Sequence, residues 1–140
     1  MDLTNMSKMR KKCILVVDDE LPVLELIRLT LEREGFRVTP KTSGDKALEA
    51  FCNDPEKYDL LITDMIMPGL TGYKLAFAVR TIRPDIPVIA CTGFSSEIGI
   101  MSGEPKINNI LMKPFDQTAL TEAVQKTLNK AMDQTGHPSF

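Results

Sequence analysis

Short apolar runs alternate with longer amphipathic segments along the chain. The clearest run, Cys13 to Val17, reads CILVV and is typical of a strand buried on both faces of a sheet. Comparable runs, rich in apolar or β-branched residues, follow at Phe36 to Thr39, Leu60 to Thr63, Pro87 to Cys91 and Asn109 to Met112. The pattern therefore predicts five short strands.

Helical stripes separate these runs. In the first stripe, Leu24, Ile27 and Leu31 recur on one helical face. Pro22 can open this helix and Gly35 can end it. Three later stripes share the spacing, namely Ala47, Leu48 and Phe51; Leu75, Ala76, Val79 and Ile82; and Leu120, Val124, Leu128 and Ala131. Residues suited to the starts of these three helices are Ser43, Thr71 and Asp116.

One further helix is expected between Glu97 and Asn108, and its sequence is the weakest of the five. It contains Gly99, Gly103 and Pro105, which are poor residues for a helix interior. We expect this fourth helix to be short or mobile.

Strands that alternate with helices indicate right-handed crossovers and a parallel sheet covered on both faces. The sequence therefore predicts the α/β class, with a flavodoxin-like doubly wound sheet of five strands in the order 2-1-3-4-5 and five helices. We expect a flexible N-terminal arm over residues 1–11, one domain over 12–131 and a polar C-terminal tail over 132–140.

Polar residues follow four of the predicted strands. Asp18, Asp19 and Glu20 follow the first, and Asp64 follows the third. The two others are Thr92 and Lys113, after the fourth and fifth strands. Each of these residues alone is commonly a turn or cap residue. Together they predict a cleft, because ligands of such sheets bind beyond the carboxyl ends of the strands.

The charges in this cleft indicate its chemistry. Asp18, Asp19 and Asp64 would repel one another, at about 4 kcal/mol for two charges ~4 Å apart and an effective dielectric of ~20. Ligands that are all oxygen favour a hard cation, Mg²⁺ before Zn²⁺, with Mn²⁺ as an alternative. Lys113 adds a positive charge, Thr92 a hydroxyl donor, and a carboxylate can act as a nucleophile toward phosphorus.

Four motifs together resemble the receiver domain of two-component response regulators: VVDDE at 16–20, ITDMIMPGLTG at 62–72, ACTGF at 90–94 and LMKPF at 111–115. The similarity runs from Lys12 to Ala131. It implies that Asp64 is phosphorylated, in a Mg²⁺-dependent reaction, by a sensor histidine kinase or a histidine phosphotransfer domain. The protein would then change conformation and signal to a protein partner.

The resemblance also implies individual roles. Asp19 would bind Mg²⁺ directly, Asp18 mainly through water, and Ile66 through its backbone carbonyl. Thr92 and Lys113 would contact the phosphoryl group, and Lys113–Pro114 resembles the family's cis peptide.

Two features depart from the family pattern. Ile110 stands where the family often has an aromatic switch residue, so an aromatic switch is not expected. The fourth helix, with its glycines and proline, belongs to the surface that the family commonly uses for output, so output through it would be weakened or altered in geometry. Phe94 lies two residues beyond Thr92. As a hypothesis, Phe94 shields the phosphoryl group from water.

Bulk properties restrict location and partners. The net charge of −2 gives no argument for a nucleic-acid or membrane surface. No apolar stretch approaches the roughly 20 residues of a spanning helix, and the N-terminus lacks the apolar core of a signal peptide. The three cysteines lack metal-site spacing and are expected to be buried free thiols. We therefore expect a cytoplasmic protein.

Three alternatives stay open. A phosphatase that forms an aspartyl-phosphate needs a second carboxylate two residues beyond the nucleophile, where this chain has Ile66. A binding module that is independent of phosphorylation would keep the fold without the switch. The chain is either a stand-alone regulator or the receiver part of a hybrid kinase.

Overall fold

The computed structural model describes residues 11–93 and 106–135. The sheet is parallel, with strands in the order β2-β1-β3-β4-β5. These strands are β1 (Cys13–Val17), β2 (Arg37–Lys41), β3 (Leu60–Asp64), β4 (Val88–Thr92) and β5 (Asn109–Met112). The predicted α/β class, strand number and strand order are confirmed.

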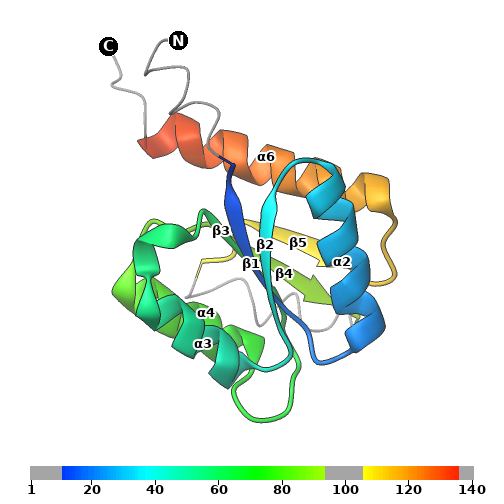
Figure 1. The fold of residues 1–140 in the computed structure, drawn as a ribbon. Helices are drawn as coiled ribbons and strands as arrows, with labels where there is room; N and C mark the ends of the chain where they lie inside the picture. The colour runs from blue at the N-terminus through cyan, green and yellow to red at the C-terminus, as the bar shows by residue number, and fades with distance from the viewer. Residues whose placement is uncertain (1–10, 94–105, 136–140) are drawn as a thin grey trace.

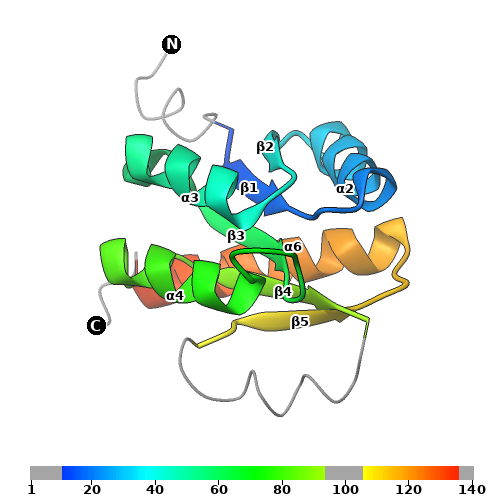
Figure 2. The same cartoon turned by 90° about the horizontal axis from the view of Figure 1, so that it is seen from below.

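In the part of the chain that the structure describes, two helices cover each face of the sheet (Figures 1 and 2). On one face α2 (Leu21–Arg33) and α6 (Gln117–Thr135) enclose a core with side chains of β1, β3, β4 and β5. On the other face α3 (Gly44–Asn53) and α4 (Gly72–Ile82) enclose a second core. A 3-10 turn, η1 (Pro55–Lys57), precedes β3. Because both faces are covered, β1, β3 and β4 are buried throughout.

Three helices begin at the residues that the sequence predicts, whereas α2 begins at Leu21, one residue before Pro22. Ser43 accepts a hydrogen bond from the backbone N–H of Lys46, at 3.2 Å. Thr71 and Asp116 accept the corresponding bonds at the starts of α4 and α6. Each bond satisfies one of the backbone donors that a helix start leaves unpaired.

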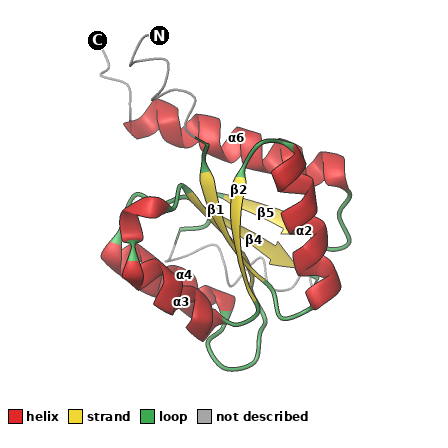
Figure 3. Cartoon of the chain, in the orientation of Figure 1, coloured by secondary structure: helices red, strands yellow, loops and turns green. Residues whose placement is uncertain are grey.

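Some boundaries differ from the prediction. The strand β2 continues through Pro40 to Lys41. Proline lacks a backbone donor, but β2 lies at the edge of the sheet, where that donor is not needed. The helix α6 continues past Ala131 to Thr135 (Figure 3).

Residues 97–105 of the predicted fourth helix lie outside the described residues, as does Phe94, and residues 106–108 are not helical. Among the described residues, no helix has the length and apolarity needed to cross a membrane. The cysteine prediction was right for Cys13 and Cys91, which are free and buried, and wrong for Cys52, which is exposed.

Candidate functional site

The strand register brings the predicted polar residues to one edge of the sheet. Val17 lies beside Thr63, so Asp18 and Asp64 follow at the same level of β1 and β3. Asp64 in turn lies beside Cys91, and Thr92 is the next residue of β4. These alignments follow from parallel pairing, which leaves all carboxyl ends of the strands on one side.

Asp18, Asp19 and Asp64 form an acidic cluster. Each can offer a carboxylate oxygen that lies within 4.8 Å of the others. Asp18 is fully buried, Asp64 is 8% exposed and Asp19 is exposed. Oxygen ligands with this spacing and charge suit a hard divalent cation such as Mg²⁺. The acidic cluster therefore fits the cation that the sequence indicates.

Lys113 is the cation of the site. Its Nζ lies 2.9 Å from Asp18 Oδ2 and 3.2 Å from Asp64 Oδ2, and it donates a hydrogen bond to each. Burial alone would lower the pKa of Lys113, but the bonds to Asp18 and Asp64 and the charges of both outweigh burial and raise it. Lys113 therefore stays protonated at any physiological pH.

The groups around Asp64 shift the pKa of its carboxyl group in opposite directions. Burial raises the pKa of its carboxyl group, and the charge of Asp18 adds to the increase. The backbone N–H of Ile66, which donates to Asp64 Oδ1 at 3.2 Å, and the ammonium of Lys113 oppose that increase without cancelling it. The ionised carboxylate is thus under-compensated, and an added cation would relieve it.

The other predicted residues surround this centre. Thr92 is fully buried at the end of β4, and its carbonyl oxygen accepts the backbone N–H of Lys113 at 2.7 Å. The Lys113–Pro114 peptide is cis, as the resemblance implied. Ile110 pairs with Ala90 in the sheet and is partly buried.

The loop after Asp64 is held by close backbone packing. The backbone N–H of Met65 donates to Cys91, and that of Gly72 donates to Met65. A Cβ atom on Gly72 would lie 1.8 Å from the carbonyl oxygen of Asp64. Glycine at this position therefore allows the start of α4 to approach the backbone of Asp64.

Two residues make contacts that the sequence did not predict. Glu20 comes to this centre, with its Oε2 3.6 Å from Lys113 Nζ. It is the third acidic residue of the motif at 16–20, which was the available signal. Ile66 contributes its backbone N–H to Asp64, while its side chain is 59% exposed.

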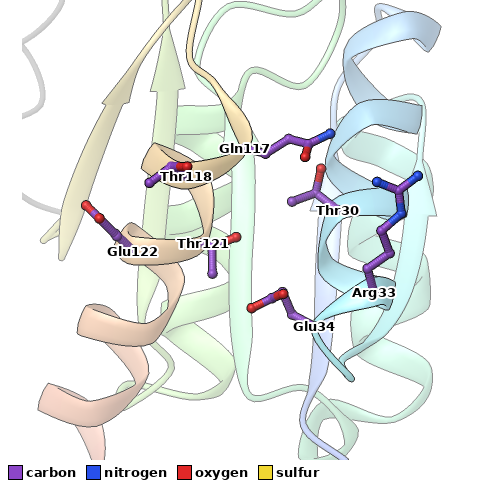
Figure 4. Close-up of a pocket in the computed structure, with 7 residues that line it drawn as sticks. All are labelled: Thr30, Arg33, Glu34, Gln117, Thr118, Thr121 and Glu122. Atoms are coloured by element: carbon purple, nitrogen blue, oxygen red, sulfur yellow. The ribbon is translucent and has the colours of Figure 1, made fainter.

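Two grooves beside α2 bear on the location of the site. One, of about 380 Å³, is largely apolar and lies beside the acidic cluster, lined by Glu20, Val23, Leu26, Lys113, Pro114 and Phe115. The other, of about 300 Å³, lies between α2 and α6 (Figure 4) and has the polar lining residues Thr30, Arg33, Glu34, Gln117, Thr118, Thr121 and Glu122. The polar groove contains none of the predicted site residues. The acidic cluster is therefore the candidate site.

Comparison with known families and proteins identifies the family of the chain. Residues 14–125 match the family model described as the response regulator receiver domain. The response regulator receiver protein CpdR of Brucella abortus is 31% identical over 118 residues, which cover 84% of this chain and 97% of CpdR. The transcriptional regulatory protein ResD of Bacillus subtilis is 32% identical over 132 residues, which cover 94% of this chain but 52% of ResD. The chain thus spans only about half of that relative.

Solved structures give the same result. A response regulator receiver domain protein of Clostridium thermocellum superposes with a TM-score of 0.78 at 31% identity, covering 85% of this chain and 95% of that one. A CheY-like receiver domain protein of Methanospirillum hungatei superposes with a TM-score of 0.82 at 26% identity, covering 89% and 99%.

Proposed function

Because the chain belongs to the response regulator receiver domain family, we propose that Asp64 accepts a phosphoryl group from a phosphohistidine. The observation that carries the proposal is the position of the Asp64 carboxylate, whose two oxygens contact the N–H of Ile66 and the ammonium of Lys113. An oxygen of Asp64 attacks phosphorus, the P–N bond to the imidazole breaks, and the imidazole leaves with a proton. The product is an aspartyl-phosphate.

Charge neutralisation is the main requirement for this transfer. Asp18, Asp19 and Asp64, with the backbone carbonyl of Ile66, would hold Mg²⁺, which supplies positive charge to the phosphoryl oxygens. Lys113 already lies between Asp18 and Asp64 and would turn its ammonium toward a phosphoryl oxygen. Mn²⁺ offers the same ligand chemistry.

Thr92 and Ile110 would carry the response. The hydroxyl of Thr92 would reorient to donate to a phosphoryl oxygen, which pulls the end of β4 toward Asp64. An aliphatic Ile110 would then follow a smaller movement than an aromatic residue. The conformational change would expose or reshape a surface for a protein partner.

The donor would be a sensor histidine kinase or a histidine phosphotransfer domain, attached to the same chain or separate. The family is one of signalling phosphoacceptors rather than of enzymes with an external substrate. Absence of nucleic-acid contact stays a prediction, since ResD is a transcriptional regulatory protein and this chain spans 52% of it.

Phosphorylation can be measured directly. Incubation with Mg²⁺ and acetyl phosphate, followed by intact mass, should show one phosphoryl adduct. Asp64→Asn should abolish the adduct, while Asp85→Asn, which changes an exposed carboxylate paired with Arg83, should keep it. A wild-type protein that forms no adduct with acetyl phosphate or a phosphohistidine donor would instead favour the binding module that is independent of phosphorylation.

A further inference from the structure

Glu20 lies beside Lys113 but outside the proposed Mg²⁺ ligands. Its Oε2 is 3.6 Å from Lys113 Nζ, and its side chain is 62% exposed. Glu20 occupies the N-cap position of α2, yet its side chain makes no cap hydrogen bond. Its backbone N–H donates to Asp18 Oδ1 at 2.9 Å, which any residue except proline would do. Helix capping therefore does not explain a glutamate here.

The charge balance of the site leaves Glu20 uncompensated. Mg²⁺ and Lys113 together balance the charges of Asp18, Asp19 and Asp64. Asp18 and Asp64 also lie closer to Lys113 Nζ, at 2.9 and 3.2 Å, than Glu20 does at 3.6 Å. The carboxylate of Glu20 is therefore an excess negative charge on the solvent side of Lys113.

We propose that Glu20 determines which phosphodonor reaches Asp64, by repelling small donors in proportion to their negative charge. The proposal rests on the proposed role of Asp64 as phosphoacceptor. A small donor such as acetyl phosphate, a dianion at neutral pH, approaches through solvent and meets this charge. Phosphoramidate carries one net negative charge and is repelled less.

A protein donor can offset this repulsion through contacts of its own. The apolar groove of Val23, Leu26, Pro114 and Phe115 adjoins Glu20 and Lys113, so a docked protein would bury apolar surface beside the charge. A small anion has no comparable contact. Glu20 would thus favour transfer from a protein over transfer from free phosphorylated metabolites.

The experiment compares the two small donors on Glu20→Gln at saturating Mg²⁺ and low ionic strength. Adduct formation followed by intact mass should accelerate about tenfold for acetyl phosphate and about threefold for phosphoramidate, from Coulomb's law at a separation of ~6 Å in water. The preference for acetyl phosphate over phosphoramidate should then rise about threefold. Added salt should shrink both effects, because exposed charges are screened.

Two control variants isolate the charge at this position. Glu34→Gln removes one negative charge from the opposite end of α2 and should leave both rates unchanged. Glu20→Asp retains the charge and should keep both rates close to those of wild type. Equal acceleration for both donors in Glu20→Gln, or acceleration in Glu20→Asp to the level of Glu20→Gln, would overturn the proposal.

Failure of this inference is distinguishable from failure of the proposed function. A wild-type adduct that depends on Asp64, combined with an unchanged donor preference in Glu20→Gln, rejects the role of Glu20 alone. A wild-type protein that accepts no phosphoryl group from any donor rejects both.

Discussion

At the amino-terminal edge of the sheet charged side chains hold loops, whereas at the carboxyl-terminal edge they crowd around Asp64. Asp59, before β3, accepts the backbone N–H of Cys13 at 2.8 Å. Arg83, after α4, donates to the carbonyl oxygens of Pro55 and Tyr58. These charges are matched to backbone groups that would otherwise lack partners, and the local result is a fixed loop.

The carboxyl-terminal edge has the opposite balance. Asp18, Asp19 and Asp64 come within 4.8 Å of one another, and Lys113 supplies a single positive charge among the described contacts. Burial and the neighbouring charge of Asp18 raise the pKa of Asp64. The fold therefore disfavours the ionised form of this carboxylate. Charged side chains that pair with backbone groups stabilise the fold, whereas like charges gathered at one place cost stability and provide a site for a cation.

Gly72→Ala should produce the largest loss, at the carboxyl-terminal edge. A Cβ atom there would lie 1.8 Å from the carbonyl oxygen of Asp64, so the loop or the start of α4 must move. We expect the free energy of unfolding to fall by about 3 kcal/mol, the upper range for an overpacked site, and adduct formation to fall with it. Urea denaturation measures the stability change.

Gly93→Ala is the matched control for that substitution. Gly93 follows Thr92 at the same edge, and a Cβ atom on it would meet nothing within 4 Å. Stability should change little. An equal loss in both variants would show that the edge is fragile in general, and that close packing at Gly72 is not its cause.

Arg83→Met should destabilise the loops at the amino-terminal edge and leave the acidic cluster unchanged. The substitution leaves the carbonyl oxygens of Pro55 and Tyr58 without their charged donor. We expect the free energy of unfolding to fall by about 2 kcal/mol, the typical effect of losing hydrogen bonds to a charged group. The Asp64 adduct should form at the wild-type rate in folded protein, as intact mass would show.

The control for Arg83 is Arg28→Met. Arg28 pairs with Glu25 and Glu32 on the exposed surface of α2. Exposed pairs contribute little, so its loss should be clearly smaller than that of Arg83→Met. A slower adduct in Arg83→Met would contradict the separation of the two edges.

Sequence reasoning predicted the carboxyl-terminal edge better than the amino-terminal one. Asp18, Asp64 and Lys113 each follow an apolar strand, and parallel pairing alone places strand ends together. The role of Arg83 depends on how the end of α4 packs against the turn before β3, and no local pattern encodes that contact. The contact between Glu20 and Lys113 also joins residues far apart in the sequence, so no local pattern predicted it.

The predicted ends of β2 and α6 were wrong because the position of each element in the fold decides where it ends, and local sequence patterns do not show that position. The predicted second strand ended at Thr39, whereas β2 continues through Pro40 to Lys41, because an edge strand tolerates proline. After Met132 the last residues of α6 are Asp133, Gln134 and Thr135, so the apolar stripe ends while α6 continues to Thr135. Hydrophobic periodicity detects the face that packs and gives no signal for a helical segment beyond it.

Asp64→Asn should have the smallest effect, with the opposite sign. The raised pKa of Asp64 means that the metal-free fold disfavours the ionised carboxylate, so its contribution to stability is fully present below the unfolded pKa and is lost as the pH rises through the folded pKa. The metal-free variant should therefore be modestly more stable than metal-free wild type at pH 7. The gain in stability should appear as the pH rises above about 4, the ordinary carboxyl pKa, and vanish below it.

Urea denaturation with and without Mg²⁺ measures the difference in stability between the two proteins. Mg²⁺ bound to the native state should stabilise wild type more than the variant. A variant less stable than metal-free wild type at pH 7 would show that Lys113 over-compensates Asp64, and the contrast between the two edges would then fail.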